Sequence, residues 1–172
     1  IRKYALNNEV NLEFSNKVIE FLDKYPREEY PVISILRKVL RLQSKESDPV
    51  TPEDTEIYKE LIEQLRDNNS KLDIVNKRLV YVYLVNYTRL KSLVYNKYFK
   101  EEYYSLLKFS IENDLYPKEN NNMGEASYVT VASEALFRKD FKWAEEFIEK
   151  YKKELKDDVR ENAYTLCMAN LN

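Results

Sequence analysis

Apolar residues recur along most of this chain at the three- and four-residue spacing of a helix with one buried side. The first such stripe precedes Pro26 and consists of Phe14, Val18, Phe21, Leu22 and Tyr25. The second precedes the polar run 44–48 and consists of Val32, Ile33, Leu36, Val39 and Leu40. The spacing predicts a helix at each stripe, with these side chains facing a core.

Two short polar motifs indicate where helices begin. Residues 51–54, Thr-Pro-Glu-Asp, place a threonine at the N-cap, a proline at the first helical position and acids in the first turn. The stripe that follows this motif consists of Ile57, Leu61, Ile62 and Leu65. Ser70 and Asp73 have the spacing of a capping box, with aspartate in place of the usual glutamate. The two motifs predict helix starts near residues 51 and 70.

The most apolar part of the chain runs from Leu72 to Asn96. Its middle, residues 79–85, is rich in β-branched and aromatic side chains and favours a strand by propensity alone. Turn residues do not flank this run, and the sequence offers no second strand for it to pair with. We therefore predict a helix that is apolar on all sides and buried.

A longer helix and three short ones are predicted for the remaining sequence. The longer helix is marked by Tyr98, Phe99, Tyr103, Leu106, Leu107 and Leu115 and is closed by Pro117. Residues 118–124, with three consecutive asparagines, are predicted to be a loop. The first short helix is lined by Tyr128, Val131, Ala132, Ala135 and Leu136. The second follows a tight turn at Asp140 and is lined by Phe141, Ala144, Phe147, Ile148 and Tyr151. The third begins at Asp157 and Asp158 and is lined by Val159, Ala163, Leu166 and Cys167.

The composition narrows the fold class to all-α. The chain of 172 residues has one glycine, Gly124, and five prolines. Sandwiches, barrels and phosphate-binding loops need several residues with positive φ, which glycine usually supplies. The net charge of −2 argues against a nucleic-acid-binding surface. Since the sequence has no apolar stretch of about 18 residues, it predicts no membrane span.

Residues 126–151 resemble one tetratricopeptide repeat. The residues that fill the family's motif positions are Tyr128, Val131, Ala132, Ala135, Ala144, Ile148 and Tyr151. The small side chains of Ala132 and Ala144 would let two antiparallel helices cross closely. Residues 98–104 resemble residues 141–147 at an offset of about 42 residues, longer than the usual repeat of about 34. Glu102 departs from the motif, which has alanine there.

The resemblance implies an α-α superhelix, that is, a right-handed solenoid of antiparallel helix hairpins. Residues 1–172 would form a single repeat domain, with hairpins at about residues 30–68, 72–115 and 124–155. Residues 1–25 and 157–172 are then expected to be half-hairpins, and the chain a fragment of a longer array. The sequence is similar in style to bacterial proteins of this class.

The resemblance also implies a non-enzymatic protein–protein interaction scaffold. Tetratricopeptide proteins bind peptides along a concave groove, and the groove positions fall on Val129 and Ser133 in the hairpin that fits best. At the 42-residue offset they fall on Tyr87 and Lys91. We expect these four residues to contact a protein or peptide. The family's carboxylate clamp needs a lysine at the first of these two groove positions and an asparagine at the second, a combination that neither hairpin has. A ligand- or peptide-sensing regulatory module attached to another domain stays open as the alternative.

Candidate catalytic groups are few. Adjacent carboxylates on a helix point about 100° apart, so a solvated helix surface explains the four pairs better than catalysis does. These pairs are Glu53-Asp54, Glu101-Glu102, Glu145-Glu146 and Asp157-Asp158. Histidine is absent, and the one cysteine, Cys167, is expected to face the core. We predict no catalytic residue, metal or cofactor, and keep an enzyme as a third reading.

The 15 tyrosines are the most unusual feature of the composition. Several of them lie among basic residues between positions 77 and 104, an arrangement that can stack on nucleic-acid bases. Tyrosine is also a common filler between packed helices, with its hydroxyl at the surface. We predict packing, with protein contact as the second interpretation and no nucleic acid. The lone cysteine and the lack of a membrane span favour a cytoplasmic location.

Overall fold

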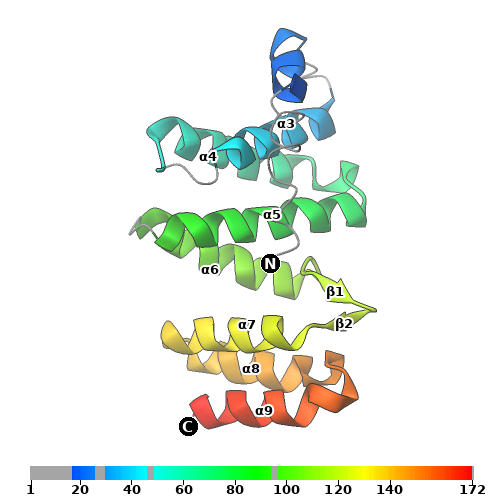
Figure 1. Ribbon diagram of the computed structural model, residues 1–172, viewed down its shortest axis with the longest axis vertical. Coiled ribbons are helices and arrows are strands. Elements are labelled where there is room, and N and C mark those ends of the chain that lie inside the picture. The colour runs from blue at the N-terminus through cyan, green and yellow to red at the C-terminus, as the bar shows by residue number, and fades with distance from the viewer. Residues whose placement is uncertain (1–16, 26–29, 46–48, 94–96, 172) are drawn as a thin grey trace. The chain divides into compact units, whose positions relative to one another are not determined.

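The computed structural model describes residues 17–25, 30–45, 49–93 and 97–171, and these residues are mostly helical (Figure 1). Residues 17–24 are helical. They are followed by α3 (Pro31–Ser44), α4 (Pro52–Asp67), the 3₁₀ turn η1 (Asn69–Lys71), α5 (Ile74–Leu93) and α6 (Lys97–Glu112). The rest comprises β1 (Lys118–Glu119), β2 (Asn122–Met123), α7 (Glu125–Phe137), α8 (Phe141–Tyr151), η2 (Lys152–Glu154) and α9 (Asp157–Leu171). The all-α prediction is confirmed for this part of the chain; Phe14 of the first stripe and Pro26 lie outside the described residues.

The chain divides into two compact units, Ile1–Tyr103 and Tyr104–Asn172. We call them unit 1 and unit 2 and describe each by itself. The boundary falls within α6, so the predicted hairpin of about residues 72–115 extends over both units. The assignment of all residues to one continuous array stays a prediction.

The predicted helix start at Thr51 is confirmed. Thr51 is the N-cap of α4, and its Oγ1 accepts a 3.1 Å hydrogen bond from the backbone N of Asp54. The Asp54 carboxylate accepts in return from the backbone N of Thr51 at 2.9 Å, which completes a capping box. Ser70, by contrast, lies in η1, and Asp73 accepts a 2.9 Å bond from the backbone N of Asn76. The predicted box at Ser70 is therefore wrong, because the aspartate itself precedes α5 and caps it.

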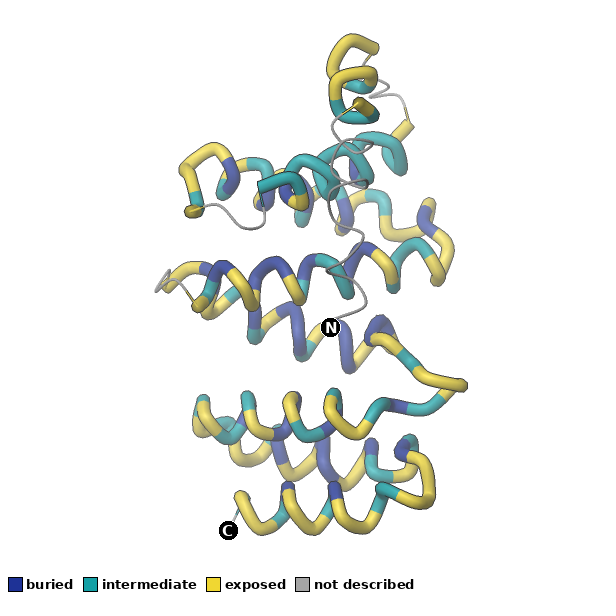
Figure 2. The backbone as a smooth tube through the Cα atoms, viewed as in Figure 1, coloured by how far each residue is buried: buried dark blue, intermediate teal, exposed yellow. Residues whose placement is uncertain are grey.

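The helix predicted over residues 79–85 is confirmed as part of α5, but its burial on all sides is not. The buried residues of α5 recur every three or four positions: Val80, Tyr81, Leu84, Tyr87, Thr88 and Lys91. Leu79 points away from this side and is exposed. Figure 2 shows buried and exposed positions alternating along the helix. The apolar composition fixed the helix but not which side of it would face the core.

The buried side of α3 also differs from the prediction. Ile35 and Leu42 are its buried residues, whereas the residues of the predicted stripe are all half-buried. Ile35 and Leu42 are seven positions apart and share one side of the helix. α3 contacts both α4 and α5, so the side chains on either side of this line are covered in part.

An aromatic cluster joins α4, α5 and α6 within unit 1. The ring centroid of Tyr58 lies 5.2 Å from that of Phe99 and 6.3 Å from that of Tyr87. Tyr87 and Phe99 meet edge to face at 5.8 Å. All three side chains are fully buried. This supports the prediction that tyrosines fill space between helices.

In unit 2, α7, α8 and α9 all contact one another (Figure 1). Ala132 of α7 and Ala144 of α8 are fully buried, as expected for a close helix crossing. The Tyr128 hydroxyl donates to the backbone carbonyl of Ile148 at 2.8 Å, so its polar end is satisfied inside the core. Phe141 and Leu166, predicted to line their helices, are exposed. Each lies at the edge of its stripe, where coverage depends on the neighbouring helices.

The predicted loop at residues 118–124 contains a two-stranded β-hairpin. Glu119 pairs with Asn122, and Asn120 and Asn121 form the two-residue turn between them. Both asparagines have positive φ, 52° and 66°, as a type I′ turn requires. Asparagine tolerates this conformation better than most residues, which explains a hairpin in a segment with only one glycine.

Candidate functional site

Two of the residues predicted to contact a partner, Tyr87 and Lys91, lie in the core of unit 1. Their exposed fractions are 0% and 2%. Tyr87 belongs to the aromatic cluster, and the Lys91 ammonium donates a 2.9 Å hydrogen bond to the backbone carbonyl of Lys45. The predicted surface position of these two side chains is wrong, because the side of α5 that carries them packs against α3 and α4.

The other two predicted residues, Val129 and Ser133, lie one turn apart on α7 in unit 2. Val129 is half-buried and Ser133 is exposed. The four predicted residues therefore belong to two different units and do not form one site within either unit.

The side of α5 opposite its buried residues carries four large, exposed apolar side chains, with the exposed Asn86 between the first pair and the second. We call it the α5 outer face and define it by Val75, Leu79, Leu90 and Leu93. Their exposed fractions are 69%, 62%, 40% and 67%. At 100° per residue these four positions fall within about one sixth of the helix circumference. Since large apolar side chains that gather on one surface often mark a binding site, this face is a candidate contact surface.

A second candidate is a cavity of about 420 Å³ in unit 1, which we call the α3–α4 cavity. Its walls are Ser34, Arg37, Lys38 and Arg41 of α3 and Ile57, Glu60 and Gln64 of α4. A neighbouring cavity of about 340 Å³ shares Arg41 and Ile57 with it. Ligand sites in proteins commonly enclose about 300–1,000 Å³, so the α3–α4 cavity is large enough for a small molecule.

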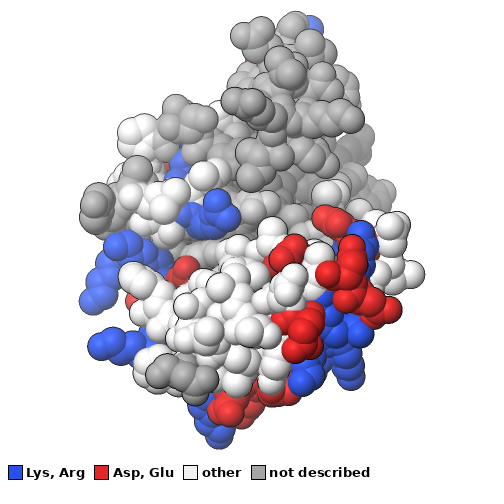
Figure 3. All heavy atoms as spheres, turned by 60° about the horizontal axis from the view of Figure 1, so that its bottom comes forward, with Lys and Arg blue, Asp and Glu red and all other residues white. Residues whose placement is uncertain are grey.

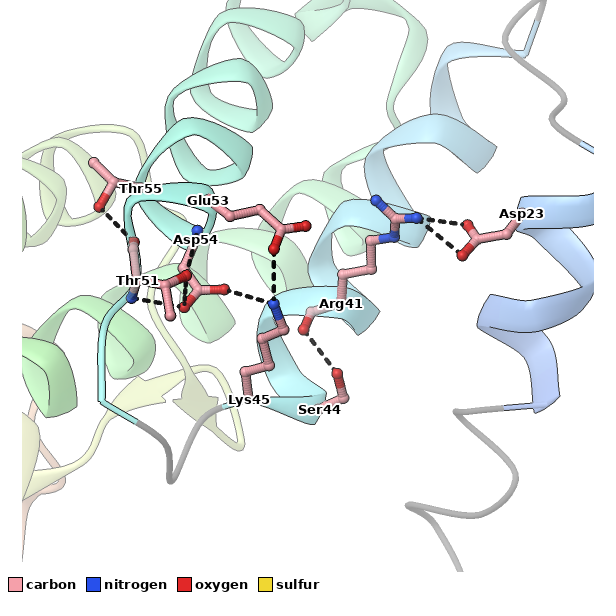
Figure 4. A network of polar contacts seen from close by, with 8 residues as sticks. All are labelled: Asp23, Arg41, Ser44, Lys45, Thr51, Glu53, Asp54 and Thr55. Atoms are coloured by element: carbon pink, nitrogen blue, oxygen red, sulfur yellow. Dashed lines mark hydrogen bonds and ion pairs between the residues drawn. The ribbon is translucent and has the colours of Figure 1, made fainter.

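Two arginines of the α3–α4 cavity hold the same carboxylate. Arg41 Nη2 donates to both oxygens of Asp23 at 2.9 Å (Figure 4). Arg37 reaches Asp23 Oδ1 with Nε at 2.9 Å and with Nη2 at 2.8 Å. Burial raises the pKa of the Asp23 carboxyl, but the hydrogen bond and charge of Arg41, together with those of Arg37, outweigh it and lower the pKa. Asp23 is therefore held as an anion between two guanidinium groups.

The other polar residues of the α3–α4 cavity pair across it. Lys38 Nζ lies 3.3 Å from Glu60 Oε2. The Ser34 hydroxyl and the Gln64 amide exchange hydrogen bonds of 3.1 and 3.2 Å. Of the three cations of the cavity wall, Lys38 thus pairs with Glu60, while Arg37 and Arg41 share the carboxylate of Asp23.

A further polar network lies where α3 ends and α4 begins (Figure 4). Lys45 Nζ contacts Asp54 Oδ1 at 3.2 Å and Glu53 Oε2 at 3.4 Å. The hydrogen bond that Lys45 donates to Asp54 raises the pKa of Lys45, and burial opposes it. Burial also raises the pKa of Asp54, but the bonds from Thr51 and Lys45 outweigh it and lower that pKa. This network stabilises the junction of α3 and α4, and its charged groups pair with one another.

The polar cluster of unit 2 is satisfied in the same way. Asp140 accepts 2.9 Å hydrogen bonds from the Tyr104 hydroxyl and from Lys108 Nζ. The Lys108 ammonium lies 5.0 Å from the Trp143 ring centroid, and Trp143 Nε1 donates to Glu112 at 3.0 Å. Burial, followed by the hydrogen bond to Asp140, raises the pKa of Tyr104. The face in Figure 3 has acidic and basic side chains next to each other around an uncharged centre.

The described residues offer little for catalysis. Cys167 is buried, and burial raises the pKa of its thiol, which disfavours the reactive thiolate. Over residues 17–25, 30–45, 49–93 and 97–171 no three or more acidic or cysteine side chains cluster as metal ligands would. In the same ranges, none of the helices combines the length and the apolar character that crossing a membrane requires.

Sequence reasoning missed the α3–α4 cavity. Arg37 and Arg41 are four residues apart, a spacing that places two guanidinium groups on one side of a helix. That signal was visible in the sequence, but their partner Asp23 lies on a different helix and its position depends on tertiary packing.

No family model, curated protein or solved structure matches this chain.

Proposed function

We propose that the chain is a tetratricopeptide-like superhelix of antiparallel helix hairpins that acts as a non-enzymatic scaffold for another protein. The packing of unit 2 supports the fold part of this proposal. Ala132 and Ala144 are both fully buried, in the positions where the tetratricopeptide motif has small residues. α9 contacts α7 as well as α8, as the first helix of a following hairpin would.

The α5 outer face carries the functional part of the proposal. This face exposes the apolar side chains of Val75, Leu79, Leu90 and Leu93 to water, which is unfavourable. A partner that covers them removes this apolar surface from water, and the gain in free energy favours binding. α5 has no acidic residue, and two of its four basic residues, Arg78 and Arg89, fall beside the outer face at 100° per residue, whereas Lys91 is buried on the opposite side. A protein segment with apolar side chains flanked by acidic ones fits this surface best. Val129 and Ser133 of α7 remain proposed contacts in unit 2.

A pull-down from native extract with quantitative mass spectrometry tests this role. A protein that binds the α5 outer face should be recovered by the parent chain and lost with the double variant Leu79→Ser/Leu90→Ser. Leu166→Ser is the matched control, since Leu166 is an exposed leucine of α9 in the other unit. Equal recovery by the parent and the double variant would exclude the α5 outer face as the binding surface. We place this interaction in the cytoplasm.

The alternative, a ligand-sensing regulatory module, is favoured by one observation, the α3–α4 cavity. It is lined by residues of two helices and has the volume of a small-molecule site. The two functions depend on different residues. Loss of the cavity arginines would impair a ligand sensor but not a scaffold.

A further inference from the structure

Arg37 and Arg41 are arranged as an oxyanion-binding pair. Both side chains come from one side of α3, and together they make four N···O contacts of 2.8–2.9 Å to the Asp23 carboxylate. Guanidinium groups match the planar, paired acceptors of carboxylates and the oxygens of phosphates. The pair is therefore already oriented for an oxyanion, and Asp23 shows the geometry in which one is held.

The charge of the α3–α4 cavity exceeds what Asp23 and Glu60 neutralise. Lys38 is paired with Glu60, while Arg37 and Arg41 share the single carboxylate of Asp23. The arginine side chains keep exposed fractions of 22% and 34%, so a dissolved anion can reach both of them.

The rest of the wall suits a small molecule more than a polymer. Ser34 and Gln64 offer a hydroxyl and an amide that now bind each other and can turn toward a ligand. Ile57 supplies an apolar surface on the α4 side. A space of about 420 Å³ holds one compact metabolite.

We propose that the α3–α4 cavity binds a small molecule through a phosphate or carboxylate group, which Arg37, Arg41 and Lys38 hold. In the free chain Asp23 occupies the arginines as an internal competitor. Binding of the ligand releases Asp23 and with it the helical residues 17–24, so the occupancy of the cavity is linked to the position of that helix. The inference is independent of protein binding by the α5 outer face, since the two sites share no residue.

Calorimetric titration at low ionic strength tests the site with two probes, inorganic phosphate and citrate. At least one should bind saturably to the parent chain, and the tighter of the two identifies the ligand group as phosphate or carboxylate. Arg41→Gln should weaken that binding about tenfold or more, and Lys38→Gln less. Asp23→Asn should strengthen it about fivefold, because an apparent dissociation constant scales inversely with the fraction of open sites.

Arg89→Gln is the matched control, because Arg89 is an exposed arginine of α5 in the same unit. Its affinity should equal that of the parent. Hydrogen exchange of residues 17–24 should accelerate when the bound probe saturates the site. The proposal is overturned if neither probe binds, if Arg41→Gln binds as the parent does, or if Asp23→Asn leaves the affinity and the exchange response unchanged. Circular dichroism of each variant verifies that the helices are intact.

Discussion

The ammonium group of Lys91 donates a 2.9 Å hydrogen bond to the backbone carbonyl of Lys45, 46 positions earlier in the chain. Lys45 is the C-cap residue of α3, where backbone carbonyls lack helical donors and the helix dipole favours a cation. The same ammonium lies 5.3 Å from the centroid of the Tyr87 ring. A single side chain of α5 therefore supplies a hydrogen-bond donor to a backbone carbonyl at the end of α3 and connects the two helices.

We expect Lys91→Met to lower the free energy of unfolding of unit 1 by about 1–3 kcal/mol. Methionine keeps most of the buried stem, but the carbonyl of Lys45 loses its donor. Urea unfolding followed by far-ultraviolet circular dichroism measures the change. Lys97→Met, at an exposed lysine of α6, is the control and should have little effect. If Lys91→Met were as stable as the parent, burying the ammonium would cost as much as its contacts contribute.

The capping box of α4 should make stability depend on acid pH. The pKa of Asp54 is lower in the folded chain than in an unfolded one, where it is about 3.9. A carboxyl with a lowered pKa stabilises the fold above its unfolded pKa, and this stabilisation is lost as the pH falls through the folded pKa. The stability difference between the parent and Asp54→Asn should therefore be largest near neutral pH and shrink below about pH 4.

Unfolding free energies at a series of pH values measure this difference. The pKa of Asp23 is also lowered, so the pH dependence of the parent's stability includes contributions from both aspartates. Comparing the variant with the parent at each pH isolates the contribution of Asp54. Asp67→Asn, an exposed aspartate at the end of α4, serves as the control. A difference that stays constant from neutral to acid pH would show that the Asp54 charge does not stabilise α4.

Ala144→Leu should destabilise unit 2 by about 1–3 kcal/mol. Ala144 is fully buried where α7 and α8 pack, so a larger side chain must push the helices apart. Hydrogen exchange of α7 and α8 should accelerate, while Ala126→Leu, at an exposed position of α7, should leave it unchanged. Unaltered exchange in the Ala144 variant would show that the crossing has room and that our register for this hairpin is wrong.

Asn121→Val should destabilise the β-hairpin by about 1–2 kcal/mol. Asn121 has a φ of 66°, which a β-branched residue adopts only with strain. Asn121→Gly should be as stable as the parent or slightly more stable, because glycine adopts positive φ freely. Melting temperatures of the two variants provide the comparison, and equal values for valine and glycine would argue against the type I′ turn.

Local signals explain what could be predicted from the sequence. The capping box at Thr51 depends on residues three positions apart, and the small residues Ala132 and Ala144 belong to one short motif. The helical state of α5 followed from the lack of flanking turn residues and of a second strand to pair with. These features need no knowledge of how distant segments pack.

Features set by tertiary packing escaped prediction. A helix as apolar as α5 has two sides that could face a core. The sequence alone could not tell whether Tyr87 or Leu79 would be buried, because this depends on where α3 and α4 pack. Lys91 carries a charge that favours the surface, yet it is buried because the end of α3 supplies an acceptor. The contact of Asp23 with Arg37 and Arg41 joins two helices and leaves only the arginine spacing as a local trace.

The position of Trp143 gives the chain a built-in optical label. It is the one tryptophan in the sequence, and in unit 2 its ring stacks on Phe147 with centroids 5.4 Å apart. Indole fluorescence therefore reports the environment of unit 2, whereas the helical signal of circular dichroism sums both units. If the emission changes at a different temperature from the helical signal, the two units melt separately, and no extrinsic dye is needed to see it.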